Sequence, residues 1–297
     1  MQAPMSSALA AEAWQGTVPL RLHLAGRPEA APLYLLHPRL APLAALNARL
    51  RRHFRRDLAP TDNTSSDGDA YSGALANSQY FSPLGSEAWA EDNDEDDEER
   101  PLWFQLGDEV LRWDIPLGAA LDALGPLPPL PVDITLHVGR APAHVAALDA
   151  CDDGFRAFVH SLKQATHLER GTARAVLTLA LARQRALYAA CCSGDRARYE
   201  DLEDVVPKRV PCRVFVAGAA TWTQLPFAAA TSSGAPATVA DALGPCVCRA
   251  LGVADVRSAA ARCHGVDVPW DCALADAWRA LRCGDHFLYV AVRLVSS

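Results

Sequence analysis

The chain has 297 residues, half of them hydrophobic, which is enough for a substantial core and by length suggests about two domains. Its net charge of −7 is unevenly spread, because residues 58–100 hold twelve acidic residues and one arginine and the remainder therefore carries +4. No stripe of arginines interleaved with aromatic residues occurs, so the sequence lacks the usual signature of a nucleic-acid-binding protein.

The cysteines and the apolar segments indicate a soluble, cytoplasmic protein. The N-terminus has no basic start followed by an apolar run, so no secretory signal is predicted. Nine cysteines, an odd number, then favour free thiols in a reducing compartment. The longest uncharged stretch, 214–240, contains Pro226 and Pro236 and cannot form one membrane helix.

The first third of the chain predicts a compact unit of strands around helices. After a short N-terminal helix, "TVPLRLHL" (17–24) alternates apolar and polar residues as a half-buried strand does, and "LYLLH" (33–37) follows as its neighbour. A helix comes next, with one apolar stripe. The stripe consists of Leu43, Leu46, Leu50 and Phe54, and the opposite face carries Arg49, Arg51, Arg52, Arg55 and Arg56.

The acidic segment 58–100 interrupts this unit. Its low hydrophobicity and single sign of charge forbid a core, so a disordered insertion is predicted. The unit then resumes with "LWFQL" and "VLRW" on either side of "GDE", which indicates a hairpin. A short apolar helix, "IPLGAALDAL", and an alternating strand, "VDITLHV" (132–138), complete it.

The middle of the chain predicts helices. Phe155, Phe158, Val159, Leu162 and Ala165 share one helical face. The alanine- and leucine-rich stretch 173–192 predicts a further helix, and 196–206 closes the block.

The last third repeats the element order of the first. Its predicted strands are "VPCRVFVA", "TWTQLPF", "CHGVDV" (263–268) and "HFLYVAVRL". The helix in "ATVADALGPCVCRALG" has a potential break at Gly244-Pro245, and "CALADAWRALR" adds a helical turn or two.

These elements predict an α+β fold with two ubiquitin-like β-grasp domains flanking a helix-rich domain. The expected boundaries are 1–16 for the N-terminal helix, 17–140 for the first ubiquitin-like domain, 141–206 for the helix-rich domain and 207–297 for the second ubiquitin-like domain. The joins are short and not rich in glycine and serine, so one compact body with a groove between the domains is expected.

Lys163 is conspicuous because only two of the 28 basic residues are lysines, the other being Lys208. Arginine stays protonated at ordinary pH, whereas a lysine amine can lose its proton and attack an acyl carbon. On the predicted helix Lys163 lies at the edge of the polar face, close in angle to Arg156. By itself this pattern favours the plainer interpretation, a solvated surface lysine, because exposed lysines rarely do chemistry.

No enzyme motif explains the sequence. There is no glycine-rich loop followed by lysine and no G-x-S-x-G elbow. Cysteines and histidines between 246 and 286 include "CH" at 263–264 and "CGDH" at 283–286, but their spacing matches no compact zinc pattern. We therefore expect structural free thiols, no metal, no cofactor and no catalytic residue, with a zinc- or cysteine-dependent enzyme as the less favoured alternative. His53 and His167 are expected on helix surfaces.

Five motifs in order resemble the autophagy-related protein 5 family. They are "AWQGTVP" (13–19), "PLYLLHPRLAPLAALNARLRRHF" (32–54), "LRWDIPLGAALDAL" (111–124), "PVDITLHV" (131–138), and "CHGVDV" together with the tail "FLYVAV" (287–292). The resemblance covers nearly the whole chain except the acidic segment.

The resemblance implies a function for Lys163. In that family a lysine within Phe-x-x-x-x-Lys-x-Ala receives the C-terminal glycine of the ubiquitin-like modifier autophagy-related protein 12, and "FVHSLKQA" (158–165) places that acceptor at Lys163. The conjugating enzyme would help to deprotonate the amine, whose reference pKa is near ~10.4. The chain itself then needs no catalytic base.

The resemblance also implies partners and a location. A coiled-coil helix of autophagy-related protein 16 would lie in the groove, and the assembly would promote transfer of autophagy-related protein 8 to phosphatidylethanolamine on the forming autophagosome membrane. A scaffold that holds the modifier non-covalently is the alternative. Arg49, Arg51, Arg52, Arg55 and Arg56 are the candidate patch for peripheral contact with anionic membrane, the plainer interpretation being a solvated helix face.

Overall fold

The computed structural model describes residues 7–58, 100–126, 128–142, 147–150, 152–199, 208–217 and 222–295. The acidic insertion predicted at 58–100 therefore lies outside the described residues, except for its two end positions. The predicted end of the helical block at 200–206 lies outside them as well. None of the described helices is long and apolar enough to cross a membrane.

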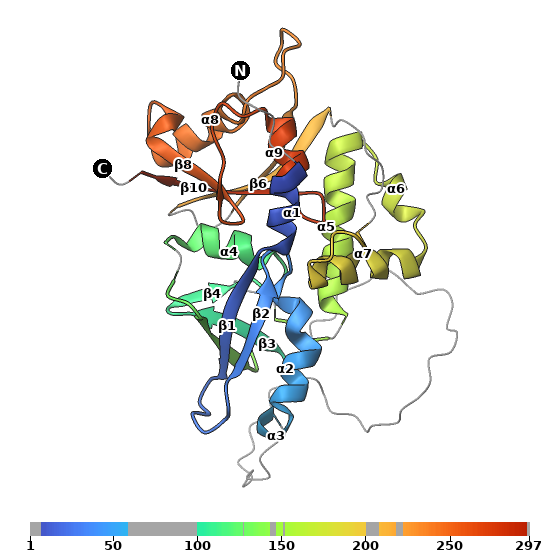
Figure 1. Ribbon diagram of the computed structural model, residues 1–297, viewed down its shortest axis with the longest axis vertical. Helices are drawn as coiled ribbons and strands as arrows, with labels where there is room; N and C mark the ends of the chain where they lie inside the picture. Colours follow the sequence, from blue (N-terminus) through green and yellow to red (C-terminus); the bar gives the residue numbers. More distant parts are fainter. Residues whose placement is uncertain are drawn as a thin grey trace, which may run out of the picture.

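Two five-stranded sheets with the same topology form the two ends of the molecule (Figure 1). The first contains β1 (Thr17–Leu24), β2 (Leu33–Pro38), β3 (Leu102–Leu106), β4 (Glu109–Leu111) and β5 (Val132–Val138) in the order β2-β1-β5-β3-β4. The second contains β6 (Arg209–Val216), β7 (Thr223–Ala228), β8 (Ala259–Cys263), β9 (Val266–Asp267) and β10 (Leu288–Leu294) in the order β7-β6-β10-β8-β9. In each sheet the first and last strands pair in parallel at the centre, and every other pair is antiparallel.

The first sheet buries one face against its own helical segments. These are η1 (Leu43–Leu46), α2 (Asn47–His53), α3 (Arg55–Leu58) and α4 (Leu117–Leu124). All four residues of the predicted apolar stripe are buried, and so are Leu20, Leu22, Ile134 and Leu136, which alternate along the two central strands. The predicted continuous helix is divided, since a 3₁₀ turn precedes α2 and Phe54 separates α2 from α3.

The second sheet is covered by α8 (Val239–Leu251) and α9 (Leu274–Leu281), and η2 (Val256–Ser258) leads into β8. A capping box between Thr238 and Asp241 begins α8. The helix continues through Pro245 without the potential break. Pro245 is exposed, and Leu243 and Val247 on the opposite side are buried in the core. The segment predicted as one strand at 263–268 is instead a turn at His264-Gly265 between β8 and β9.

The helical block consists of α5 (Asp153–Arg170), α6 (Arg174–Leu177) and α7 (Leu181–Ser193). The single helix predicted over 173–192 is wrong, since the chain turns at 178–180 between α6 and α7. The turn satisfies its own carbonyl groups, because the Gln184 side chain donates to the carbonyls of Val176 and Leu179 at 3.3 and 3.0 Å.

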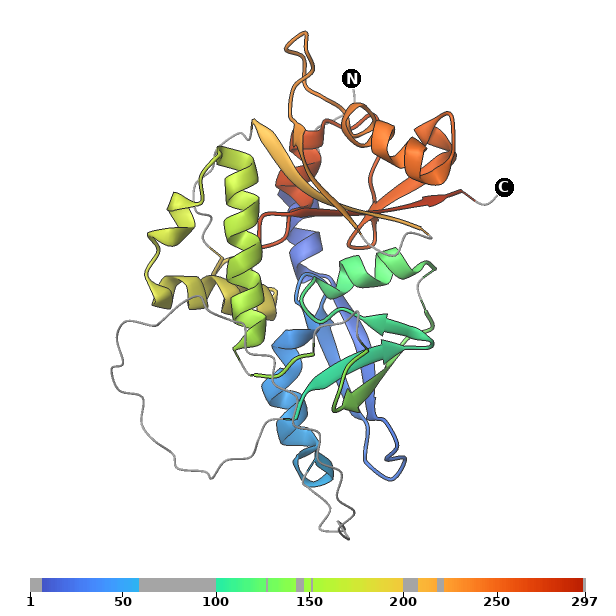
Figure 2. The ribbon, with the colours of Figure 1, turned by 180° about the vertical axis from the view of Figure 1, so that it is seen from behind.

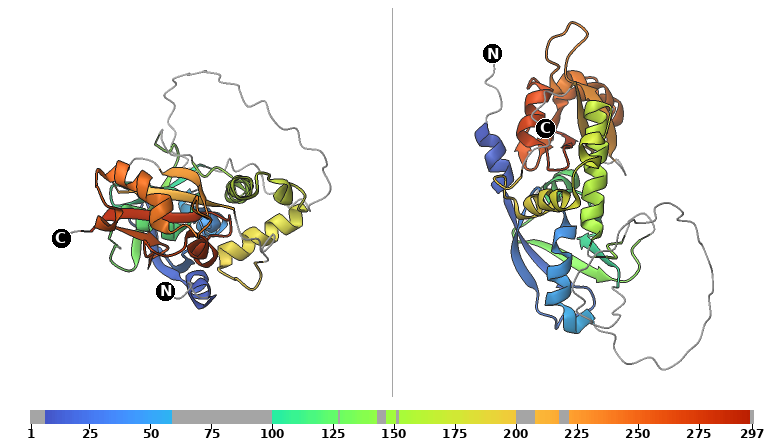
Figure 3. Two further views of the ribbon diagram at one scale, coloured as in Figure 1. Left: turned by 90° about the horizontal axis from the view of Figure 1, so that it is seen from above. Right: turned by 90° about the vertical axis from the view of Figure 1, so that its right-hand side faces the viewer.

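Helix α5 lies alongside both ends of the molecule and contacts β6, β7 and η1 (Figure 2). The N-terminal helix α1 (Ser7–Gln15) packs against α9, so it also links the two ends (Figure 3). The parts form one body, not separate beads, as the short joins predicted.

Candidate functional site

The helix that carries Lys163 is fixed at both ends by local sequence. Before α5, the Asp153 carboxylate accepts the backbone N–H groups of Asp149 and Ala150 at 2.9 and 2.8 Å. After it, Gly171 adopts φ 76°, a left-handed conformation that glycine takes without strain, and its N–H donates to the His167 carbonyl. The 18-residue helix therefore has defined limits, which sets the direction in which Lys163 points.

One face of α5 is buried over its whole length. The five apolar residues predicted to share that face are all buried. Near its start, the rings of Phe155 and Phe158 pack against Tyr188 of α7, with ring centroids 5.9 and 5.4 Å apart. The packing makes α5 a rigid element of the junction.

Lys163 is half-buried at the edge of this face, as the helical spacing predicted. Within the described part of the chain its ammonium makes no hydrogen bond or ion pair. Arg156, His160 and His167, on the same side of the helix, are exposed. The amine is thus not held by an internal partner and lies beside a surface that another protein can reach.

Lys208, the other lysine, is exposed at the start of β6, and its carbonyl accepts from Ala229. It is not on α5. The two lysines therefore belong to different elements of the fold.

A buried polar cluster that the sequence did not predict clamps α5 to the second sheet. Arg213 of β6 is 5% exposed, and its guanidinium donates to Ser161 Oγ and Gln164 Oε1 of α5, both at 3.2 Å. It also donates to the Tyr289 hydroxyl at 2.7 Å, and that hydroxyl donates to Asp285 at 2.6 Å. Burial raises the pKa of Asp285, an effect that the nearby Arg213 charge opposes.

A second buried contact joins the far end of α5 to the same domain. Glu169 Oε2 lies 3.3 Å from His286 Nδ1, and both side chains are almost completely buried. Burial disfavours the charged Glu169 carboxylate, but the hydrogen bond and charge of His286, together with Arg170, outweigh it and lower the pKa of Glu169. Two independent polar contacts therefore fix α5 against the second domain.

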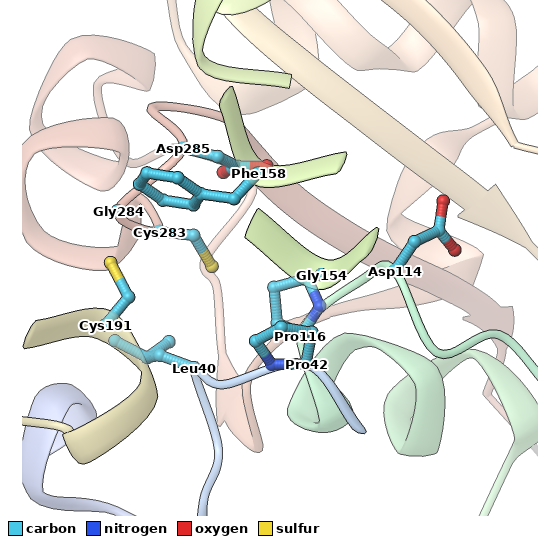
Figure 4. Close-up of a pocket in the computed structure, with 10 residues that line it drawn as sticks. All are labelled: Leu40, Pro42, Asp114, Pro116, Gly154, Phe158, Cys191, Cys283, Gly284 and Asp285. Carbon is cyan, nitrogen blue, oxygen red and sulfur yellow. The ribbon is translucent and has the colours of Figure 1, made fainter. Parts of the chain in front are cut away.

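A small cavity lies where the first domain, the helical block and the second domain meet (Figure 4). Leu40 and Pro116 come from the first domain, Cys191 from α7, and Cys283 and Asp285 from the loop before β10. Its volume of about 20 Å³ has room for about one water molecule and not for a substrate.

The cysteine and histidine positions considered for chemistry do not assemble a reactive site. Cys283 Sγ lies 3.1 Å from His264 Nε2, but both are buried. Burial raises the pKa of the Cys283 thiol well above its usual value and, together with the charge of Arg39, lowers the pKa of His264 to about 3. The pair is therefore a neutral thiol beside a neutral imidazole. No group of three or more metal-ligating side chains is found within the described ranges.

The five arginines of the candidate basic patch do not all face solvent. Arg49, Arg52, Arg55 and Arg56 are exposed on α2 and α3. Arg51 is half-buried, and its guanidinium donates to Asn47 Oδ1 at 2.8 Å and to the carbonyls of Arg100 and Asp149. Arg51 thus ties the end of α2 to two distant segments, and the exposed patch consists of the other four arginines.

Two open cavities border α1 between the domains. One, of about 230 Å³, is lined by Ala13, Arg39, Gly265 and Val266 among others. The other, of about 520 Å³, lies between α1 and the segment that follows α7. Both hollows leave open space beside α1.

Two family models match the chain. "Autophagy protein ATG5, alpha-helical bundle region" covers residues 155–204, and "Autophagy protein ATG5, UblB domain" covers residues 209–292. The first match includes Lys163 and the second includes Arg213.

Curated relatives and a solved structure agree with these models. The chain is 24% identical over 195 residues to autophagy protein 5 of Arabidopsis thaliana, covering 64% of this chain and 47% of that protein. It is 24% identical over 207 residues to autophagy protein 5 of Oryza sativa subsp. japonica, covering 68% of this chain and 45% of that protein. The chain thus spans about half the length of these relatives.

The crystal structure of Kluyveromyces marxianus Atg5 superposes with a TM-score of 0.68 at 16% identity, over 96% of this chain and 99% of that one. At this identity the match concerns the fold alone. It confirms the predicted α+β class, with two ubiquitin-like domains flanking a helix-rich one.

Proposed function

Because the chain belongs to the autophagy protein 5 family, we propose that it is a non-catalytic scaffold that accepts the ubiquitin-like modifier autophagy-related protein 12 on Lys163. The observation that carries the proposal is the setting of Lys163. Among the residues that the structure describes, the amine has no hydrogen-bond or ion-pair partner. It lies at the edge of the exposed face of a helix that Arg213 and Glu169 clamp to the second domain. A rigid helix with a reachable amine is what a conjugating enzyme needs to present its thioester.

The proposal assigns the chemistry to the conjugating enzyme. Burial raises the pKa of the Cys212, Cys263 and Cys283 thiols, so these three stay protonated at ordinary pH and are poor nucleophiles. The cavity described at the three-part junction is too small for a substrate. We therefore propose a ligase-like assembly that promotes lipidation of autophagy-related protein 8 on phosphatidylethanolamine, with the chain cytoplasmic and peripheral on the forming autophagosome membrane.

Intact-mass measurement tests covalent attachment. The chain is co-expressed with the modifier and its activating and conjugating enzymes, purified under denaturing conditions and weighed. We expect the mass to rise by that of one modifier less one water, and peptide mapping to place the branch at Lys163. Co-purification of the two proteins at their separate masses would favour the non-covalent scaffold instead.

A coiled-coil helix of autophagy-related protein 16 is the proposed occupant of the space beside α1. Val266 lies in the wall of the 230 Å³ cavity and is half-buried. We expect Val266→Glu to reduce co-purification with that helix at least about tenfold, because a charge would be desolvated against an apolar helix face. Val253→Glu is the matched control, since Val253 lies outside this wall. Equal loss with both variants would contradict the placement.

The four exposed arginines of α2 and α3 are the proposed membrane contact. Each basic residue near an anionic surface contributes about 1 kcal/mol, so Arg52→Gln with Arg56→Gln is expected to weaken binding to phosphatidylserine vesicles about 30-fold at low salt. Arg196→Gln with Arg249→Gln, also exposed, serves as the control. If the fraction of protein that co-sediments with the vesicles changes neither with salt nor with the Arg52 and Arg56 substitutions, this patch is not the membrane contact.

A further inference from the structure

The buried Arg213 cluster continues to the surface beside Lys163. Gln164, which accepts from Arg213 through Oε1, has its Nε2 2.8 Å from Nε2 of the exposed His160. Gln224 of β7 supports the arrangement, because its Oε1 accepts from Arg213 Nε at 2.9 Å and its amide nitrogen lies 3.5 Å from Gln164 Oε1. A chain of hydrogen bonds therefore runs from the second sheet to an imidazole on the outer face of α5.

Each bond in this chain has a fixed direction. A guanidinium can only donate, so the atom of Gln164 that faces Arg213 must be the carbonyl oxygen. The amide nitrogen of Gln164 then faces His160 and donates to its Nε2. A neutral imidazole that accepts at Nε2 carries its proton on Nδ1. The second domain thereby sets the tautomer of His160.

His160 is one helical turn before Lys163. Residues three apart on a helix are surface neighbours, with Cβ atoms about 5–6 Å apart. An acyl group that the Lys163 amine attacks is therefore brought to the same stretch of helix surface as the His160 ring. His167, one turn after Lys163, is also exposed but is not connected to the Arg213 cluster by a hydrogen bond among the described residues.

We propose that His160 assists the conjugating enzyme as a hydrogen-bond donor to the thioester during transfer of the modifier to Lys163, with Gln164 as the residue that positions it. The inference rests on the proposed function. The Lys163 nitrogen attacks the thioester carbonyl carbon and forms the C–N bond, and the carbonyl oxygen becomes an oxyanion to which His160 Nδ1–H donates. Collapse of the intermediate breaks the C–S bond. The conjugating enzyme's thiolate leaves, and the proton lost by the amine goes to that thiolate or to solvent.

The tautomer of His160 can be determined without measuring transfer of the modifier. Long-range ¹H–¹⁵N spectra of the isolated chain at pH 8.5 are expected to show His160 protonated at Nδ1. In Gln164→Glu the carboxylate still accepts from Arg213 but can only accept from His160, so the proton is expected to move to Nε2. An Nε2-protonated His160 in the unsubstituted chain would overturn the inference.

Single-turnover transfer from a conjugating enzyme charged with the modifier tests the role of His160 in transfer. Loss of one oxyanion donor costs about 10²–10³ in an enclosed site, and for this exposed position we expect His160→Leu to slow transfer at least about tenfold at saturation. The half-saturating concentration is expected to stay unchanged. His160→Asn, which keeps an N–H donor, is expected to retain most of the rate.

The control is His167→Leu, which removes the imidazole on the other side of Lys163. This variant is expected to accept the modifier at the same rate as the unsubstituted chain. Two results would overturn the inference while leaving the proposed function standing. One is an unchanged transfer rate in His160→Leu, and the other is a slowing that is due entirely to a higher half-saturating concentration. Failure of the unsubstituted chain to accept the modifier at Lys163 would overturn both. Melting temperatures within about 2 °C of the unsubstituted chain are expected for both variants, because both side chains are exposed.

Discussion

Replacing Lys163 by arginine is expected to abolish covalent attachment of the modifier and leave the fold intact. Arginine keeps the positive charge and the helix propensity, but its guanidinium does not become a nucleophile at ordinary pH. Since the Lys163 ammonium has no internal partner in the described ranges, the free energy of unfolding is expected to change by less than about 0.5 kcal/mol. The measurement is the fraction of chain in the higher-mass species after reconstituted conjugation.

Lys208→Arg is the matched control, because Lys208 is exposed at the start of β6 and is the one remaining lysine in the chain. It is expected to conjugate as the unsubstituted protein does. If Lys163→Arg still conjugates and Lys208→Arg does not, the acceptor has been assigned to the wrong residue.

Two buried neutral histidines are expected to contribute on the order of 4 kcal/mol of stability that is lost when the pH falls from 7 to 5. Burial lowers the pKa of His37 to about 4, and burial with the charge of Arg39 lowers that of His264 to about 3. In the unfolded chain both rings bind a proton below about pH 6.5. Between pH 6.5 and the folded-state values the unfolded state therefore holds more protons, and stability falls as the pH falls, by about 2 kcal/mol for each ring at pH 5.

Urea unfolding at the two pH values measures this loss. His37→Gln removes one titrating ring, while its side-chain amide can still donate to the Ala41 carbonyl, as His37 Nε2 does at 3.2 Å. This variant is expected to lose about half as much stability on acidification, whereas His53→Gln, at an exposed position, is expected to lose as much as the unsubstituted protein. Equal stability of the unsubstituted chain at pH 7 and 5 would contradict the buried neutral rings.

The alternation of apolar residues was sufficient to predict the central strands of both sheets, because one face of each sheet is a continuous core. Val210, Cys212, Val214 and Val216 are all buried as predicted. The same reasoning failed for Arg213, which alternation places on the polar face. That face is covered by α5, whose position depends on contacts between residues about fifty apart in the chain. Periodicity reports which side of a strand is apolar, not what packs on the other side.

The position of Lys163 could be predicted from helical spacing, but its hydrogen-bonded surroundings could not. His160 and Gln164 read as ordinary surface residues of a helix, and no local pattern links them to Arg213 or Gln224. Two local features differ from what the helical patterns predicted: the turn between α6 and α7, and the direction of the Arg51 side chain. Both depend on side-chain hydrogen bonds that the sequence indicates only weakly. The Gln184 side chain caps the turn between α6 and α7, and the Arg51 side chain folds back onto Asn47 instead of facing solvent.

The N-terminal helix has a consequence for how the protein is made. Within α1, Ala13 belongs to the core of the second domain and Trp14 to that of the first, and the helix packs on α9 (274–281). Because α1 precedes α9 in the sequence, it leaves the ribosome first, and its apolar residues have no partner surface until α9 has been synthesised. A nascent chain or a C-terminal truncation that ends before α9 would carry that unmatched helix, which is the kind of surface that chaperones bind and quality control recognises.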